Sequence, residues 1–246
     1  RHYPKTKKRS HETIKSIMKL KQKKYRDEMN LFLIEGYHLV EEARRYDCIE
    51  TIITTLDEKF EESTLYVSLE VMKKLAFTQT PQPIMAVCKK DNRNQNIIIA
   101  NRYLLLDRVQ DPGNVGTIIR TALALGVNQV IMSKDCVDLY NDKVIRATQG
   151  AIFQMNICIM DLKEAIFFLQ KNHVSVYGTC LKNASSIDTY PPQERMAFIM
   201  GNEGQGISQE ILDICNYLIY IPIHSIESLN VGVAAAITMY HFQEKI

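Results

Sequence analysis

Five short apolar runs in the C-terminal part of this 246-residue chain limit its fold more than any other feature. Each run is predominantly apolar, and segments with helical character separate one from the next, so we interpret the runs as strands. Strands that are apolar on both faces and alternate with helices are typical of a mostly parallel sheet covered by helices on both sides. The runs are Tyr103–Asp107, Gln129–Ser133, Val174–Leu181, Ala197–Met200 and Leu218–Pro222.

The N-terminal part predicts a smaller α/β unit of its own. It opens with residues 10–25, where Ile14, Ile17 and Lys21 fall at helical spacing and predict a basic amphipathic helix. Shorter patterns follow. They predict strands at residues 32–36, 49–54, 64–68 and 83–88, and helices at residues 38–45 and 69–76.

A polar segment separates the two parts. Lys89–Asn96 is rich in Asn and Lys and lacks apolar residues, which makes it the best candidate for a linker. A chain of 246 residues is long enough for two modest domains, each with a hydrophobic core. We therefore predict a first domain over residues 1–92 and a second over residues 97–246.

The composition is that of an ordinary globular protein, which we expect in the cytoplasm. Apolar residues make up 46% of the chain and charged residues 24%, and no apolar run approaches the roughly 20 residues that a membrane span needs. The polar, basic N-terminus lacks the apolar segment of a secretory signal. The six cysteines lie far apart, with no Cys/His cluster at zinc-ligand spacing, so we expect reduced thiols and no metal site.

Charge is distributed unevenly along the chain. Residues 1–26 contain eleven Lys and Arg and the single acid Glu12, a net charge of +10, which leaves −8 for the remainder because the total is +2. A basic arm on an acidic body favours a polyanionic partner such as RNA, since neutralised phosphates release counterions. The alternative is a solvated tail that binds nothing.

Three polar, glycine-containing signatures begin where apolar strands end, which is where open α/β sheets place ligand-binding loops. The first is Asp111-Pro-Gly-Asn-Val-Gly-Thr-Ile-Ile-Arg120. Apolar residues at helical spacing predict a helix here, capped by Asp111 or Asn114 and ended near Gly126. Arg120 falls on the face opposite the apolar stripe, and an arginine in that position is, by itself, more often a solvated surface residue.

The second signature is Gly201-Asn-Glu-Gly-Gln-Gly206, between a strand and a helix starting near Ser208. Its glycines would let backbone amides approach a ligand, although such a loop is more often only a tight turn. The third comprises Ile221-Pro-Ile and Ser228-Leu-Asn-Val231, ahead of a terminal helix rich in small residues. Ser228 or Asn230 is expected to cap that helix.

Together the three signatures closely resemble the motifs of the SpoU (TrmH-like) class of SPOUT RNA methyltransferases. In that class the patterns N-x-G-x-x-x-R, G-N-E-G-x-G and S-L-N-V occur in this order with comparable separations. Upstream, Phe32–Ala43 and Thr80–Val87 look like the ribosomal-protein-like, substrate-binding α/β domain that often precedes the catalytic domain, and Asp138–Ala151 is similar to the family segment between the first two signatures.

The resemblance implies the fold and the reaction. The C-terminal domain would be an α/β SPOUT domain with a parallel sheet, whose chain end threads through a loop to form a deep trefoil knot that builds the cofactor pocket. The enzyme would transfer a methyl group from S-adenosylmethionine to a ribose 2'-hydroxyl. It would act as a homodimer through its C-terminal domain, with one subunit completing the other's site.

Residue by residue, the resemblance implies catalytic positions at Asn114, Arg120, Glu203, Ser228 and Asn230, and cofactor contacts at Thr179, Gly201, Asn202, Ile221, Leu229 and Asn230. We assign RNA contacts to Lys7, Lys8, Arg9, Lys23, Lys24, Glu35 and Arg146. The chain departs from the usual pattern in having one residue fewer between Ile221 and Leu229, and in having Pro83 where the family often has glycine.

An arginine is a poor base, so we expect Arg120 to bind the target phosphate and stabilise developing alkoxide charge rather than accept the proton. Ribosomal RNA is the favoured substrate, for processing of rRNA, and tRNA is the alternative. A non-catalytic RNA-binding relative would have lost one of the key polar residues, and all are present. A dinucleotide-dependent oxidoreductase would need a glycine fingerprint early in the sheet, and none is visible.

Overall fold

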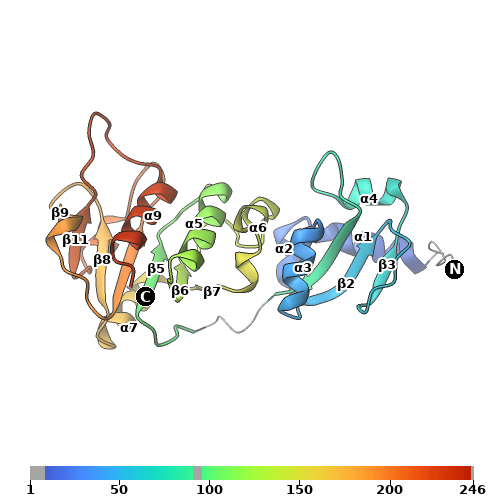
Figure 1. Ribbon diagram of the computed structural model, residues 1–246, viewed down its shortest axis with the longest axis horizontal. Coiled ribbons are helices and arrows are strands. Elements are labelled where there is room, and N and C mark those ends of the chain that lie inside the picture. The colour runs from blue at the N-terminus through green and yellow to red at the C-terminus, as the bar shows by residue number, and fades with distance from the viewer. Residues whose placement is uncertain (1–8, 91–95, 245–246) are drawn as a thin grey trace. The chain divides into compact units, whose positions relative to one another are not determined.

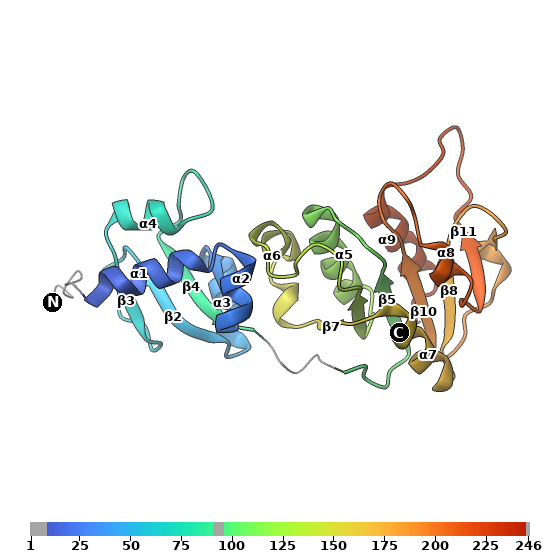
Figure 2. The same cartoon turned by 180° about the vertical axis from the view of Figure 1, so that it is seen from behind.

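The computed structural model describes residues 9–90 and 96–244, and these form two compact units (Figures 1 and 2). The first unit comprises Arg1–Asn92 together with Tyr140–Phe153, and the second comprises Arg93–Leu139 and Gln154–Ile246. The predicted boundaries at residues 92 and 97 stay a prediction, and most of the expected linker lies outside the described residues. No helix in the described ranges is long and apolar enough to span a membrane.

The first unit is a four-stranded mixed sheet with helices packed on it. The strand order is β1-β4-β2-β3, in which β4 is antiparallel to both of its neighbours and β3 runs parallel to β2. The strands are β1 (Leu31–Glu35), β2 (Ile49–Thr54), β3 (Thr64–Tyr66) and β4 (Ile84–Lys89), and the helices before residue 90 are α1 (Arg9–Lys19), α2 (Lys23–Met29), α3 (Tyr37–Arg45) and α4 (Leu69–Leu75).

The single helix predicted over residues 10–25 is wrong, because the chain forms two helices, α1 and α2, with a turn between them. Leu20 is buried in this turn, and its backbone NH bonds to the carbonyl of Ile17. The side chain of Lys21 donates to the carbonyls of Lys74 and Ala76 at the end of α4. The interruption therefore results from tertiary contacts that helical periodicity does not report.

The segment Tyr140–Phe153 lies far along the sequence yet packs within the first unit. It contains α6 (Asp142–Thr148) and the 3₁₀ turn η1 (Ala151–Phe153). The ring of Phe32 on β1 lies 4.6 Å from that of Tyr140 and 6.2 Å from that of Phe153. The chain therefore leaves the second unit after Leu139 and returns to it at Gln154.

The second unit contains a seven-stranded, all-parallel sheet in the order β7-β6-β5-β10-β8-β11-β9. Its strands are β5 (Arg102–Leu106), β6 (Gln129–Met132), β7 (Asn156–Ile159), β8 (Ser175–Thr179), β9 (Ser185–Ser186), β10 (Met196–Met200) and β11 (Tyr217–Tyr220). The five predicted strands are confirmed as β5, β6, β8, β10 and β11. The two strands that the sequence did not indicate, β7 and β9, lie at the edges of the sheet.

Helices cover both faces of this sheet, as its apolar strands predict (Figures 1 and 2). One face carries Tyr103, Leu105 and Ile199, which pack with α7 (Leu162–Lys171) and α8 (Gln209–Leu212). The other face carries α5 (Pro112–Ala124) and α9 (Val231–His241), which also pack against each other. On that second face Phe242, just after α9, stacks on Phe198 of β10. The predicted α/β class is therefore confirmed.

Two fully buried tyrosines of this sheet differ in how their hydroxyls are satisfied. The Tyr103 hydroxyl donates to the carbonyl of Ile98 at 2.7 Å and accepts from the amide of Ala100 at 2.8 Å. In the part of the chain that the structure describes, the Tyr177 hydroxyl has no hydrogen-bond partner. Burial, with the neighbouring Tyr217 and Tyr190, raises the pKa of Tyr177 to about 12, so this hydroxyl is neutral at ordinary pH.

We expect Tyr177→Phe to raise the free energy of unfolding by about 1 kcal/mol, because it removes a hydroxyl that is desolvated on folding without a hydrogen bond to compensate. The matched change Tyr103→Phe should lower it by about 1 to 3 kcal/mol, since a carbonyl and an amide lose their partner. Urea denaturation of the two variants measures both values. Equal destabilisation by the two changes would contradict this account of Tyr177.

Candidate active site

Two loops of the second unit meet because their strands are neighbours. β5 and β10 are hydrogen-bonded in parallel, with Leu106 opposite Met200 at their carboxyl ends. After β5 the chain adds strands on one side of the sheet, and β8, β11 and β9 lie on the other side, so the order of strands reverses here. Open α/β sheets bind ligands at such a point. The loops that follow β5 and β10 carry the first two signatures.

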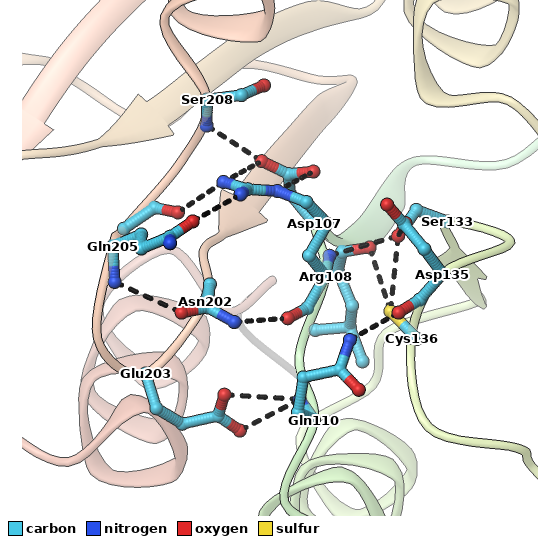
Figure 3. Close-up of polar contacts among 12 residues, drawn as sticks. Asp107, Arg108, Gln110, Ser133, Asp135, Cys136, Asn202, Glu203, Gln205 and Ser208 are labelled. Atoms are coloured by element: carbon cyan, nitrogen blue, oxygen red, sulfur yellow. Dashed lines mark hydrogen bonds and ion pairs between the residues drawn. The ribbon is translucent and has the colours of Figure 1, made fainter.

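Glu203 joins these two loops. Its carboxylate accepts hydrogen bonds from the backbone amide of Gln110 at 3.1 Å (Figure 3). It also accepts from the backbone amide of Asp111 at 2.8 Å, at the start of α5. Burial alone would raise the pKa of Glu203, but the hydrogen bonds, that from Asp111 foremost, outweigh it and leave the pKa below its ordinary value. Glu203 is therefore an anion that anchors the helix start, not a carboxyl suited to accept a proton at neutral pH.

Asn202 shapes the glycine-containing loop. Its side-chain oxygen accepts from the amides of Gly204 and Gln205, both at 3.0 Å, and its side-chain nitrogen donates to the carbonyl of Arg108 at 2.8 Å. Its backbone pairs with that of Gly206 in both directions. A Cβ atom on Gly201 would lie 2.2 Å from the backbone of Gly206, so only glycine permits the loop to close this tightly.

The first and third signatures meet through two asparagines. The side-chain nitrogen of Asn230 donates to the side-chain oxygen of Asn114 at 3.1 Å, across the contact between α5 and α9. Asn230 also caps α9 by accepting from the amides of Gly232 and Val233, while Asp111 caps α5 by accepting from Asn114. A side-chain hydrogen bond from Asn114 contributes to the lowered pKa of Glu203. Asn114 thus connects the polar residues of all three signatures.

The predicted cofactor positions lie at the carboxyl ends of adjacent strands. Thr179 ends β8, whose neighbours are β10 and β11; Gly201 directly follows β10 and Ile221 directly follows β11. The Thr179 hydroxyl donates to the carbonyl of Ile199 at 2.7 Å, so it holds the strand end in place. Ile221 and Leu229 are half-buried, and Leu229 immediately precedes the cap of α9.

Two predicted catalytic residues are not held by the rest of the site. Arg120 lies on the exposed side of α5, and Ser228 is exposed in the loop before α9. Within residues 9–90 and 96–244, neither side chain has a hydrogen-bond or ion-pair partner. Asn114, Glu203 and Asn230 form one connected group, whereas Arg120 and Ser228 remain available to a ligand.

The described members of the predicted RNA-binding set lie in the first unit. Lys7 and Lys8 lie outside the described residues, and Arg9 begins α1. Lys23 pairs with Asp27, and Arg146 on α6 pairs with Asp142. The remaining basic member, Lys24, has its ammonium 5.5 Å from the ring of Tyr25.

Glu35 is buried, and its carboxylate is already used by the protein. It accepts from the backbone amides of Phe77, Thr78 and Gln82 and from the hydroxyl of Thr78. These donors belong to the loop before β4, so Glu35 organises that loop. Its assignment as an RNA contact stays a prediction, as do the other site assignments.

Four residues that sequence reasoning missed also hold the site. Asp107 accepts from the amide of Ser208 at 2.8 Å, and Arg108 contacts both Gln205 and Gly206. The Ser133 hydroxyl accepts from the amide of Arg108, and Asp135 accepts from Ser133 (Figure 3). The sequence signal for Asp107 was an acid at the end of the apolar run Tyr103–Asp107. Nothing comparable marks Arg108.

Comparison with known proteins identifies the family. The SpoU rRNA methylase family matches residues 101–240, more than half of the chain. The chain belongs to this family. An MRM3-like substrate-binding domain matches residues 11–86 of the same chain. The order of the two matches is the order that the sequence patterns predict.

Several relatives match almost the entire chain. One is the 23S rRNA (guanosine(2553)-2'-O)-methyltransferase RlmP of Bacillus subtilis, 39% identical over 238 residues that cover 94% of this chain and 95% of the relative. An AdoMet-bound rRNA methyltransferase from Sinorhizobium meliloti is 28% identical with a TM-score of 0.85, covering 96% of this chain and 95% of that one. An RNA 2'-O ribose methyltransferase is 25% identical with a TM-score of 0.80, covering 93% and 94%.

These matches confirm four predictions made from the signatures. The family is SpoU, the fold is an α/β SPOUT fold with a parallel sheet, the protein is an RNA methyltransferase, and the cofactor is S-adenosylmethionine.

The anchoring role of Glu203 predicts a defined pH dependence of stability. We expect Glu203→Gln to lower the free energy of unfolding near neutral pH, because a charged acceptor of two backbone amides is lost. A carboxyl whose pKa is lowered by folding stabilises the native state fully above its unfolded value, and this stabilisation is lost as the pH falls through the folded value. The ordinary value here is 4.5.

The difference between wild type and Glu203→Gln should therefore shrink as the pH falls below 4.5, because protonation of the wild-type carboxyl removes the same charge. Urea denaturation at a series of pH values measures it. A difference that stays constant as the pH falls until the protein unfolds would show that the charge of Glu203 is not what anchors the loops.

Proposed function

We propose that this protein transfers a methyl group from S-adenosylmethionine to a ribose 2'-hydroxyl of ribosomal RNA, and so takes part in rRNA processing in the cytoplasm. The observation that carries the proposal is the connection of Asn114, Glu203 and Asn230, one from each signature. Arg120 is exposed on α5, the helix that carries Asn114, and has no partner among the described residues. The relative RlmP, whose name specifies 23S rRNA, supports ribosomal RNA over tRNA.

The residues assigned to the cofactor fit its chemistry. Thr179, Gly201 and Ile221 stand at the ends of three adjacent strands, and Leu229 is half-buried beside the cap of α9. Backbone groups and apolar side chains are what a nucleobase requires, and Asn202 and Asn230 add polar atoms without a charge. When bound, S-adenosylmethionine supplies an activated sulfonium methyl group. We also propose that the chain end forms the trefoil knot of the class around this pocket.

The roles of the protein groups follow from charge and exposure. Arg120 binds a phosphate of the target nucleotide and stabilises negative charge that develops on the attacking 2'-oxygen, because its planar guanidinium donates two hydrogen bonds at once. Asn114 and Asn230 orient the ribose, and Ser228 is free to hydrogen-bond to RNA. The proton leaves to water or phosphate, since Glu203 is held as an anion by backbone amides.

The first unit binds RNA beyond the target nucleotide. Its helices α1 and α2 carry exposed lysines, among them Lys15, Lys19 and Lys24. Such phosphate contacts position the RNA without reading its sequence. Arg146 and Lys23 add to this charge, and Glu35 supports it indirectly by ordering the loop before β4.

The direct test is methyl transfer from radiolabelled S-adenosylmethionine to total RNA from cells that lack this protein. We expect label in ribosomal RNA, in dinucleotides that resist alkali because their ribose 2'-oxygen is methylated. Arg120→Ala should reduce the rate by about 100-fold or more, since charge stabilisation in the transition state is lost. Arg120→Lys should also fall well below wild type, because an ammonium cannot replace the bidentate contact.

Other outcomes would change the assignment. Label confined to tRNA would support tRNA as the substrate. Absence of label in every pool despite cofactor binding would support either a ribosomal assembly intermediate as substrate or a non-catalytic RNA-binding role. Full activity of Arg120→Lys would contradict the bidentate role of Arg120.

We also propose that the protein is a homodimer joined through α5 and α9. Val233, Ile237 and Tyr240 form an exposed stripe along α9, with exposed fractions of 48%, 38% and 71%. The opposite side of α9 is buried within its own unit through Gly232, Ala235 and Met239. Leu125 at the end of α5 lines the same apolar surface groove as Ile237. An apolar stripe on a helix that is already packed suits contact with a second copy.

We expect wild type to sediment as a dimer of its 28.3 kDa chain and Ile237→Glu to sediment as a monomer. The reason is that a carboxylate would be desolvated at the centre of the stripe. Phe167→Glu is the control, because Phe167 is 55% exposed on α7, on the other face of the sheet. A dimer that survives Ile237→Glu, or dissociates equally with Phe167→Glu, would refute this interface.

A further inference from the structure

Arg108 occupies a backbone conformation that arginine seldom adopts. Its φ is +56°, in the left-handed region where a side chain is usually disfavoured and glycine is common. It lies between Asp107 and Val109, two residues after the end of β5. Contacts elsewhere in the protein must therefore hold this residue in place.

The backbone of Arg108 is bonded on both sides. Its amide donates to the hydroxyl of Ser133 at 2.9 Å, and its carbonyl accepts from the side-chain nitrogen of Asn202 at 2.8 Å. The left-handed turn therefore connects the loops that follow β5, β6 and β10. These two bonds need only the backbone of residue 108, so any residue that tolerates this conformation would keep them.

The side chain of Arg108 adds a second set of contacts that only arginine supplies. One terminal nitrogen donates to the side-chain oxygen of Gln205 at 2.8 Å (Figure 3). The other donates to the carbonyl of Gly206 at 3.0 Å. The guanidinium also pairs with Asp107 at 3.3 Å, and Asp107 in turn accepts from the amide of Ser208. The guanidinium thus spans the end of the glycine-containing loop.

We propose that Arg108 is a positioning residue that keeps the loop Gly201–Ser208 in the conformation that binds S-adenosylmethionine. The proposal rests on the cofactor placement given under Proposed function. A loop with three glycines samples many backbone conformations, and ordering it on binding would weaken affinity. Arg108 orders the loop before the cofactor binds, so the binding free energy is not reduced by the conformational entropy that ordering the loop would cost.

Charge and exposure favour this role over direct contact with RNA. The guanidinium side chain is 26% exposed, and its carboxylate partner Asp107 is 6% exposed, so the pair is largely enclosed. Both terminal nitrogens are engaged by the protein itself. Arg120, in contrast, is exposed with no partner among the described residues, as a phosphate ligand requires.

Arg108→Gly separates the two sets of contacts. Glycine accepts φ near +56° and keeps the amide and carbonyl bonds, so only the guanidinium is lost. We expect the Kd for S-adenosylhomocysteine, measured by calorimetry, to rise about tenfold if about a tenth of the loops remain competent. At saturating cofactor, kcat should stay within about threefold of wild type. Arg108→Lys should be intermediate, because one ammonium cannot reach all three acceptors.

Hydrogen exchange gives the readout that a purely structural role would not move. In protein without cofactor, amides of residues 201–208 should exchange faster in Arg108→Gly than in wild type, and saturating S-adenosylhomocysteine should remove the difference. His173→Gly is the matched control, since His173 also has a left-handed φ, +63°, at the opposite end of the same unit's strands. It should leave the Kd and the exchange of residues 201–208 unchanged.

Three results would overturn the proposal, each for a different reason. If Arg108→Gly has the same Kd for S-adenosylhomocysteine and the same amide exchange at residues 201–208 as wild type, the side chain does not position the loop. A higher KM for RNA with an unchanged cofactor Kd would make Arg108 a substrate contact. If S-adenosylhomocysteine binds wild type without protecting residues 201–208, the cofactor placement itself fails, and the proposal fails with it.

Discussion

The hydrogen-bonded pairing of β5 with β10 is the constraint on which the site depends. These strands are separated by about ninety residues of sequence, yet Leu106 and Met200 are direct partners in the ladder. Because the strands are parallel neighbours, their carboxyl ends lie at the same edge of the sheet. The loops that follow them therefore lie next to each other. The third signature joins them because α9 packs on α5 and brings Asn230 to Asn114.

The protein uses carboxylates as acceptors for loop amides in both of its units. Asp107 holds Ser208, Glu203 holds the start of α5, and in the first unit Glu35 holds the loop before β4. Each acid replaces the secondary structure that a loop cannot form, because unsatisfied amides are costly away from water. These loops are therefore ordered by side chains, which allows them to lie at a strand end and still present backbone atoms to a ligand.

Sequence patterns were sufficient to predict the features of the fold that depend on local chemistry. Continuous apolar runs predicted the central strands, and the polar residues after them predicted where a site would lie. They could not predict the edge strand β9, which is only two residues long, or the break between α1 and α2, which depends on contacts with the end of α4. Arg108 was missed for the same reason, since its left-handed turn and its partners exist only once β5, β6 and β10 are side by side.

The excursion of the chain through Tyr140–Phe153 has a consequence for how this protein can be divided. The chain passes between the two units at residues 92, 139 and 153, so the methyltransferase sequence match includes a segment that is structurally part of the other unit. Tyr140 and Phe153 rest against Phe32 of β1. A fragment that began after the linker would carry both aromatic rings without the surface that covers them. The two units are thus distinct in structure, but the first cannot be exchanged independently of the second. A different N-terminal domain would have to provide an apolar surface that covers the rings of Tyr140 and Phe153.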